Sequence, residues 1–429
     1  MTLPKAPTVT SHSSVDSLNI ANRFESVRKQ TEAICAPLEI EDYVIQSMPD
    51  TSPMKWHLAH TTWFFETFVL KAFAPSYSPF DERFAFLFNS YYVQAGERFV
   101  RHHRGLLSRP TVKEVYAYRS YVDGAMMQFL SHDLPTEAHS VLETGLNHEQ
   151  QHQELIVTDL KHNLSVNPLF PAYSEQSLPL SADLGALSWH SFDEGIVPIG
   201  HESEAFHFDN ELPIHRQFLE PFELANRPVT NGEFEQFITS GGYNDATLWL
   251  SEGFSKVQTE NWQCPIYWIP EDGGWSEFTL YGKQPLDPNA PATHLSYFEA
   301  DAFARWAGYR LPTEFELETV LKSVNTEGHF SHEMIFHPHF STRDAQKHPF
   351  VHLFGSAWEW TNSHYSPYPG YKPVAGALGE YNGKFMANQF VLRGGSCATP
   401  KDHIRPTYRN FFPTSARWQF SAIRLTKTK

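Results

Sequence analysis

The sequence has little cysteine, no excess of positive charge and no long hydrophobic run. Its three cysteines, Cys35, Cys264 and Cys397, show no CxxC spacing, which excludes a disulfide framework and favours a reducing compartment. With 33 Lys and Arg against 49 Asp and Glu, the net charge of −16 argues against nucleic acid and anionic membranes as partners. No apolar stretch approaches the ~20 residues that cross a bilayer, and the N-terminal segment lacks the apolar core of a signal peptide. We therefore expect a soluble, cytoplasmic protein.

What is present is a large apolar and aromatic content that changes in kind along the chain. The chain has 429 residues, of which 41% are apolar and 15% aromatic, enough for two or three domains. Residues 1–165 have few glycines and long helical periodicities, whereas residues 193–429 are rich in glycine, proline, tryptophan and short alternating runs. Residues 166–192 contain three prolines and no sustained period. We predict a helical domain, a linker and a second domain with these boundaries.

Four segments of the first domain have the pattern of amphipathic helices. Two of them carry clear start signals, namely Pro53 directly after Ser52 and a capping box from Thr111 to Glu114. The expected ranges are about 18–34, 53–73, 111–130 and 135–162. Four amphipathic helices of this length pack most naturally as a bundle.

The sharpest chemical signal is a pair of histidines in the fourth helix. His148 and His152 are four residues apart, so they project from one side of the helix, which also carries apolar residues and should face the bundle interior. His60 lies on the aromatic stripe of the second helix, which should also point inward. Three imidazoles converging inside a bundle predict a metal site with open coordination positions. Spacing alone leaves the metal open, because three histidines also suit zinc.

Other residues of the same kinds are not expected to bind the metal. Glu154 lies about 200° around the helix from His152, so we expect it to support the site rather than to be a ligand, which argues against a two-histidine, one-carboxylate centre. Histidine pairs at this spacing also arise by chance in a chain with 23 histidines. The histidines expected to be ordinary surface or capping groups are His57, His102, His103, His139 and His162.

These histidine motifs resemble those of a known family. The segment His148-Glu149-Gln150-Gln151-His152-Gln153-Glu154, together with Trp56-His57-Leu58-Ala59-His60, resembles the DinB-like domain of ergothioneine sulfoxide synthases. The resemblance implies a DinB-like four-helix bundle with Fe(II) as cofactor, bound by His60, His148 and His152.

The second half supports the same family, because five short segments in order resemble a formylglycine-generating-enzyme-like, or sulfatase-modifying-factor (FGE-sulfatase), domain. The segments are Gly200 to Asn231, which includes Asp209-Asn210-Glu211 and Pro228-Val229-Thr230-Asn231, then Trp306-Ala307-Gly308-Tyr309-Arg310-Leu311-Pro312-Thr313-Glu314, Gly355-Ser356-Ala357-Trp358-Glu359-Trp360-Thr361, Arg393-Gly394-Gly395-Ser396 and Ala422-Ile423-Arg424-Leu425. The implied fold is C-type-lectin-like, an irregular α+β domain. Formylglycine-generating oxidases share two cysteines that lie close together in the sequence and bind copper. Cys397 has no such neighbour here, so we expect the domain to bind substrate instead.

The resemblance implies a reaction and its substrates. Ergothioneine sulfoxide synthases join a thiol sulfur to C2 of the imidazole of hercynine with O2, and the product with L-cysteine is hercynyl cysteine sulfoxide. Hercynine carries a quaternary ammonium group, which binds aromatic faces and oxygen dipoles. The residues that match this pocket are Asn410 and Phe411 with Gln151. Enzymes of the branch that uses γ-glutamylcysteine share an acidic residue two positions after the pocket asparagine. This chain has Phe412 at that position, which argues against γ-glutamylcysteine as the sulfur donor.

A double tyrosine favours the branch that uses free cysteine. Tyr91 and Tyr92 match this branch, and either phenol is expected to donate a proton or hydrogen near the O2 position, with Tyr92 the closer one. Arg101 is the expected clamp for the cysteine carboxylate, because a guanidinium binds a carboxylate with two parallel hydrogen bonds. Arg98 and Arg104 remain alternatives for this role.

Three kinds of alternative remain open from the sequence. The same chemistry is compatible with γ-glutamylcysteine or a selenium donor, and with an ovothiol-type synthase. A DinB-like thiol transferase or hydrolase that uses zinc or nickel is a second kind, and a requirement for O2 separates it from the first. A lectin-like binding module attached to a helical bundle is the third, and it requires the three histidines to lie apart.

Overall fold

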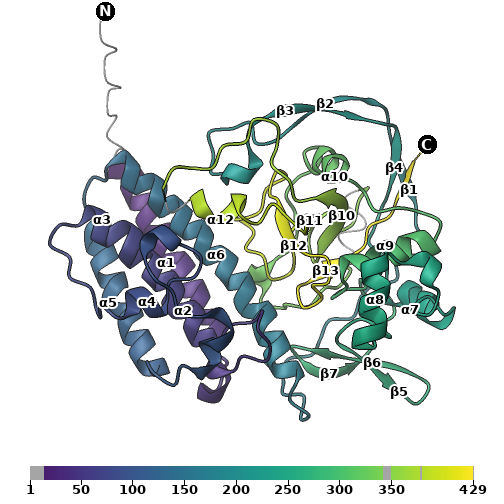
Figure 1. The fold of residues 1–429 in the computed structure, drawn as a ribbon, viewed down its shortest axis with the longest axis horizontal. Coiled ribbons are helices and arrows are strands. Elements are labelled where there is room, and N and C mark those ends of the chain that lie inside the picture. The colour runs from purple at the N-terminus through teal and green to yellow at the C-terminus, as the bar shows by residue number, and fades with distance from the viewer. Residues whose placement is uncertain (1–13, 342–348, 377–378, 429) are drawn as a thin grey trace, which may run out of the picture. The chain divides into compact units, whose positions relative to one another are not determined.

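The computed structural model describes residues 14–341, 349–376 and 379–428. Contacts divide the chain into two compact units, Met1–Ile156 and Val157–Lys429. The first unit is helical and the second is rich in short strands (Figure 1), so the predicted fold class, helical followed by mixed α and β, is confirmed. None of the described helices combines the length and the apolar character that a membrane span requires.

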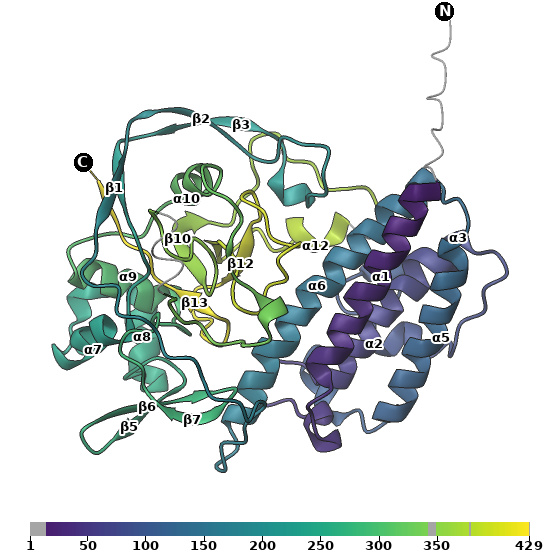
Figure 2. The same cartoon turned by 180° about the vertical axis from the view of Figure 1, so that it is seen from behind.

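Four long helices build the first unit, and all four were predicted. Figure 2 shows them packed side by side. They are α1 (Ser14–Cys35), α2 (Met54–Phe64), α5 (Val112–Leu130) and α6 (Thr136–Ser165), the last of which continues into the second unit. The capping box predicted before α5 is present, since the Thr111 hydroxyl accepts from the Glu114 backbone N–H. Shorter elements are a 3-10 turn at Ile40–Val44, a π-helical turn at Phe65–Leu70, α3 (Lys71–Phe73), α4 (Phe84–Leu87) and 3-10 turns at Val93–Ala95 and Arg101–Leu106.

Helix α2 is buried along its whole length. Every residue from Met54 to Phe64 is buried, although three of them are histidine or lysine and two are threonine. A buried polar side chain is costly unless it finds a hydrogen-bond or metal partner. The polar residues of α2 are therefore the place to look for function.

The second unit consists of small sheets with helices packed around them. Its central sheet has the strand order β12-β11-β10-β13, and α10 packs against β10 and β11 (Figure 1). A second sheet, β1-β4-β14, pairs the beginning of the unit with its end. The large hydrophobic core includes the wholly buried Trp358 and Trp360 of β10. This irregular α+β arrangement matches the prediction for the second half.

The bounds of these elements are as follows. The strands are β1 (Trp189–Phe192), β2 (Gly195–Ile199), β3 (His215–Leu219), β4 (Phe222–Ala225), β5 (Trp268–Glu271), β6 (Gly274–Thr279), β7 (Gly282–Pro285), β8 (Gly328–His329), β9 (Phe354–Gly355), β10 (Trp358–His364), β11 (Gln389–Arg393), β12 (Asn410–Pro413), β13 (Ser421–Ala422) and β14 (Thr426–Thr428). The helices are α7 (Asn231–Thr239), α8 (Ser251–Glu260), α9 (Tyr297–Trp306), α10 (Glu314–Leu321) and α12 (Glu380–Gly383). Residues 166–188 form no helix or strand, and Tyr173 and Ala182 donate backbone hydrogen bonds to Leu280 and Phe340.

Candidate metal centre

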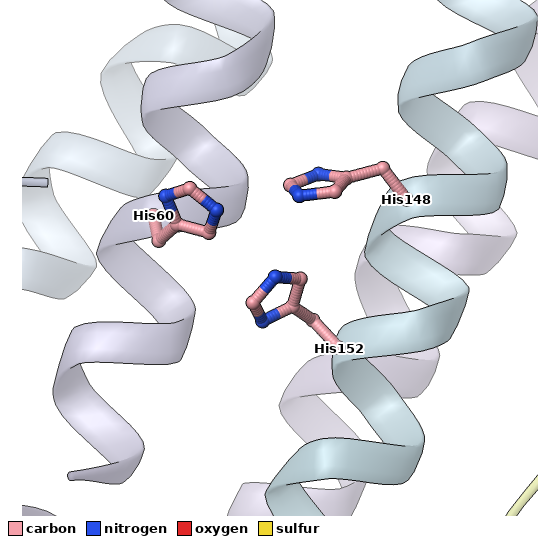
Figure 3. Close-up of side chains that lie close together, drawn as sticks. All are labelled: His60, His148 and His152. Carbon is pink, nitrogen blue, oxygen red and sulfur yellow. The ribbon is translucent and has the colours of Figure 1, made fainter. Parts of the chain in front are cut away.

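The three histidines singled out in the sequence come together inside the helical unit. His60 projects from α2, and His148 and His152 project from α6 toward it (Figure 3). One ring nitrogen of each lies within 4.8 Å of the others, a spacing that a single metal ion can bridge. All three side chains are buried. The group contains no carboxylate from the described residues, so Glu154 stands outside it, as expected.

A glycine lets the two helices that carry the histidines approach closely. Gly145 of α6 lies one turn before His148, and a Cβ there would come within 2.7 Å of the Phe65 ring and 2.9 Å of the Phe64 ring. Phe64 in turn stacks on His148 with ring centroids 4.7 Å apart. A larger residue at position 145 would push α6 away from α2, so this glycine helps to set the spacing of the histidines.

Burial keeps the three imidazoles neutral. It lowers the pKa of His148 to about 4, and it lowers the pKa values of His60 and His152 well below the usual value. The neighbouring histidine charges act in the same direction on His60 and His152. A neutral imidazole keeps a lone pair on one ring nitrogen, which is the form that binds a metal.

Hydrogen bonds fix the orientation of two of the rings. His60 donates from Nδ1 to the backbone carbonyl of Phe88 at 2.5 Å, and His152 Nδ1 lies 2.9 Å from His57 Nδ1. Because Nδ1 of His60 and Nδ1 of His152 are engaged in these contacts, Nε2 of each ring remains available to bind a metal. The buried Nδ1 of His148 has no hydrogen-bond partner among the described residues. A buried ring nitrogen without a hydrogen-bond partner, beside two oriented imidazoles, fits a metal centre, because metal binding offsets the cost of burying this group.

Aromatic rings enclose the cluster. The rings of Trp56 and Trp63 both lie nearly parallel to His60, with centroids 4.5 Å and 5.5 Å away. The guanidinium of Arg104 lies 3.3 Å from the centroid of the Trp56 ring. These rings exclude water from the sides of His60 and restrict its rotation.

The expectation that His57 is an ordinary surface or capping group is wrong. Its side chain is 1% exposed and pairs with His152. His162 is also buried, whereas His102 and His103 are exposed as expected. The available signal for His57 was its position three residues before His60, which places both on one side of α2.

The two predicted tyrosines occupy different environments. Tyr92 is buried, and its ring centroid lies 6.5 Å from that of His148 and 5.8 Å from that of Trp63. Tyr91 is half-buried, and its hydroxyl accepts a hydrogen bond from Arg101 at 2.8 Å. The structure therefore brings Tyr92 to the cluster and pairs Tyr91 with the predicted clamp.

The three arginines also differ. Arg101 is exposed and donates both to Tyr91 and to the backbone carbonyl of Asp50. Arg98 is exposed and donates to the Ser90 carbonyl at 3.3 Å. Arg104 is buried and donates to the hydroxyls of Ser52 and Ser90. Arg104 is thus occupied by structural contacts, which leaves the two exposed arginines as candidates for binding a carboxylate.

The remaining predicted substrate residues lie in two places. Gln151 is half-buried on α6, beside His152. Asn410, Phe411 and Phe412 follow one another on β12 in the second unit, where all three are half-buried. Phe411 stacks on Tyr365 with a centroid distance of 4.0 Å and also lies 5.8 Å from Phe385 and 6.5 Å from Tyr381. This aromatic group offers several ring faces to a cation.

Comparisons with known proteins agree with the motifs. Residues 191–334 match the sulfatase-modifying factor enzyme 1-like domain. The chain is 28% identical to a hercynine oxygenase of Mycolicibacterium thermoresistibile over 95% of each chain, and 28% identical to that of Mycobacterium tuberculosis over 68% of this chain and 72% of the other. It is 30% identical to ergothioneine biosynthesis protein 1 of Schizosaccharomyces pombe, over 53% of this chain and 29% of that protein. The predicted resemblance to ergothioneine sulfoxide synthases is thereby confirmed. All three cysteines are free thiols.

Proposed function

We propose that this protein is a non-haem iron(II)-dependent sulfoxide synthase that joins the sulfur of L-cysteine to C2 of the hercynine imidazole with O2. The product is hercynyl cysteine sulfoxide, and the reaction takes place in the cytoplasm. The observation that carries the proposal is the buried three-histidine cluster in a chain that is similar to a hercynine oxygenase along 95% of its length. The oxidoreductase class predicted from the sequence agrees with these relatives.

In this proposal His60, His148 and His152 are the metal ligands. Three neutral imidazoles would hold the ion and would leave further coordination positions for substrates. Bound Fe(II) would supply the redox chemistry with O2 and the open positions at which a thiol and an imidazole meet. The protein's part is to hold three lone pairs in place and to keep the surroundings dry, which the stacked Trp56 and Trp63 support.

Tyr92 is the proposed proton donor of the reaction. Its buried ring packs edge-on to His148, so the phenol is held beside the cluster rather than at the surface. A phenol in this position can supply a proton or a hydrogen to reduced oxygen and so favour coupling over simple oxidation of the thiol. Tyr91 has a supporting role, because its hydroxyl is bonded to Arg101.

Hercynine binding is assigned to the domain of residues 193–429. The half-buried ring of Phe411, which stacks on the buried Tyr365, offers an aromatic face to the quaternary ammonium group, and Asn410 offers an amide oxygen. For the second substrate, Arg101 is the proposed clamp of the cysteine carboxylate. Phe412 provides no charge for the second carboxylate or the amine of γ-glutamylcysteine, which supports free cysteine as the donor.

The test is an assay of the full-length protein reconstituted anaerobically with Fe(II) and then exposed to air. Hercynine is supplied with either L-cysteine or γ-glutamylcysteine, and products are identified by mass spectrometry. We expect hercynyl cysteine sulfoxide from free cysteine and consumption of O2. Sulfoxide from γ-glutamylcysteine alone would overturn the donor. Absence of any coupled product with O2 unconsumed would favour a metal-dependent thiol transferase of the DinB type.

A further inference from the structure

We propose that His57 is a positioning residue that holds the His152 ring in the orientation required for metal binding. This inference rests on the proposed metal centre. It assigns a role to a residue outside the three ligands, and it makes an imidazole rather than a carboxylate or a carbonyl the group that orients one of them.

The geometry of the pair is specific. His57 Nδ1 and His152 Nδ1 are 2.9 Å apart, and the two rings are tilted by 58° with centroids 5.2 Å apart. The two histidines come from different helices, α2 and α6. The edge of the His57 ring also meets Trp56, with centroids 5.6 Å apart and planes at 77°, which restricts its rotation. The His57 ring is thus held by His152 at Nδ1 and by Trp56 at its edge.

The hydrogen bond determines which nitrogen of His152 is available. Two ring nitrogens can form a hydrogen bond only if one carries the proton and the other a lone pair. If His152 binds a metal through Nε2, its Nδ1 carries the proton and donates to the lone pair of His57 Nδ1. His57 must then be neutral and carry its own proton on Nε2. The pair therefore selects one tautomer and one ring orientation of the ligand.

His57 and the Phe88 carbonyl make equivalent contributions to two ligands. The Phe88 carbonyl accepts from His60 Nδ1, as His57 accepts from His152 Nδ1. Metal-binding histidines usually donate their second N–H to such an acceptor, and its loss typically weakens metal binding about 10- to 100-fold. An acceptor that is a neutral side chain adds no negative charge to the cluster, unlike a carboxylate.

Packing alone gives no reason for a histidine at position 57. The side chain is 1% exposed on a helix that is buried throughout, and an apolar residue there would avoid the cost of burying two ring nitrogens. That cost is offset if the ring has a partner that needs it. The hydrogen bond between His57 and the proposed ligand His152 provides such a partner.

The experiment measures metal affinity rather than turnover. Full-length apoprotein is titrated with Co(II) in competition with a chromophoric chelator, and the visible spectrum of bound Co(II) is recorded. His57→Leu removes the acceptor and should weaken Co(II) binding at least tenfold and alter the spectrum. His57→Asn, whose amide oxygen lies close to the place of Nδ1, should restore affinity to within a few-fold of the parent. Tyr43→Phe is the control, because it removes buried hydrogen bonds to Cys35 and Tyr116 elsewhere in the same unit and should leave affinity unchanged.

The possible outcomes separate the two proposals. If the parent protein binds Co(II) and His57→Leu binds it equally well with the same spectrum, the role of His57 is wrong while the metal centre stands. If the parent protein itself binds no Co(II), the metal centre fails and the inference with it. Should His57→Leu not fold, His57→Asn and His57→Gln provide the comparison, since glutamine places its oxygen farther out. Equal affinity of these two variants would overturn the inference.

Discussion

At the residue scale, Tyr92 differs from its neighbour by lying against the histidine cluster. Tyr92→Phe keeps the ring and its packing on Phe68 and Trp63 but removes the hydroxyl. If the phenol supplies the proton, the variant should lose most of the coupled sulfoxide and gain oxidation of cysteine to sulfinic acid. Mass spectrometry of both products, expressed as their ratio, measures this change.

Tyr91→Phe is the matched control for that variant. It removes a hydroxyl from the adjacent ring and disrupts the bond to Arg101. We expect it to raise the KM for cysteine while leaving the ratio of the two products near the parent value. A product ratio in Tyr92→Phe equal to that of the parent would exclude the proposed role of Tyr92.

A second residue-scale prediction concerns Lys161, which is buried in the second unit. Its Nζ lies 2.8 Å from His294 Nε2 and 4.8 Å from the Tyr267 ring centroid. Burial lowers the pKa of Lys161 from 10.5 to about 8. Between pH 8 and 10.5 the unfolded chain therefore binds more protons at Lys161 than the folded chain does, so stability rises with pH.

Lys161→Met should abolish this rise. Urea unfolding of the second unit at pH 8 and pH 10 is expected to show a gain for the parent protein on the order of 2 kcal/mol over the variant. Lys256→Met removes a partly exposed lysine that pairs with Glu260 on α8, so it should keep the parent slope. Equal pH dependence of the Lys161→Met variant and the parent would show that Lys161 is not desolvated in solution.

The sequence was informative about single residues where the signal was local. The four-residue spacing of His148 and His152 and the aromatic stripe around His60 suffice to predict an inward cluster. The pairing of His57 with His152 was not predicted: the position of His57 three residues before His60 indicates the same side of α2, but its hydrogen-bond partner depends on how α2 packs on α6. The spacing of α2 and α6 depends on contacts such as Gly145 with Phe65, which no local pattern encodes.

At the scale of elements, one buried carboxylate connects the helices that carry the histidines. Glu149 follows His148 directly on α6, and it accepts from Arg28 of α1, Arg119 of α5 and Thr31. The same two arginines donate to the hydroxyls of Thr62 and Thr61, which follow His60 on α2. Burial opposes ionisation, but the charges of Arg119 and Arg28 lower the pKa of Glu149 to about 2. All four long helices are thus joined at the level of the three-histidine cluster.

Glu149→Gln should therefore disturb both the bundle and the site. The substitution leaves the buried guanidiniums of Arg28 and Arg119 without their shared counter-charge, and breaking a buried pair in this way costs about 3 kcal/mol or more. Urea unfolding of the apoprotein measures the loss. Glu143→Gln is the control on the same helix, because its pair with the half-exposed Arg23 is near the surface and should cost less than about 1 kcal/mol. Similar losses in the two variants would contradict the central role of Glu149.

Helices were more predictable than strands for a physical reason. The start of α5 follows from the capping box of Thr111 and Glu114, and the entry into α2 follows from Pro53, because both signals act within one turn. The π-helical turn at Phe65–Leu70 was not predicted, since it depends on packing rather than on a local residue preference. Strand pairing was also beyond local signals: Thr426–Thr428 pairs with Phe222–Ala225, about half the chain away.

At the scale of the whole molecule, the chain consists of two compact units, and the three proposed ligands all belong to the first. A ligand that binds only the folded state stabilises it by mass action, by about 2.7 kcal/mol when its concentration is 100 times the Kd. Metal binding at the cluster should therefore raise the unfolding temperature of the helical unit by a few degrees. The second unit contains none of the three ligands, so its transition should shift less.

Differential scanning calorimetry of the full-length protein tests this, with Co(II) or Fe(II) added under anaerobic conditions and then removed with a chelator. We expect the metal to move one transition upward and the chelator to return it to the apoprotein value. His148→Ala, which removes one ligand, should abolish the shift. A single transition that shifts as a whole would mean that the two units unfold together, since α6 runs from Thr136 in the first unit to Ser165 in the second. A shift that persists in His148→Ala would place the metal elsewhere and contradict the three-histidine centre.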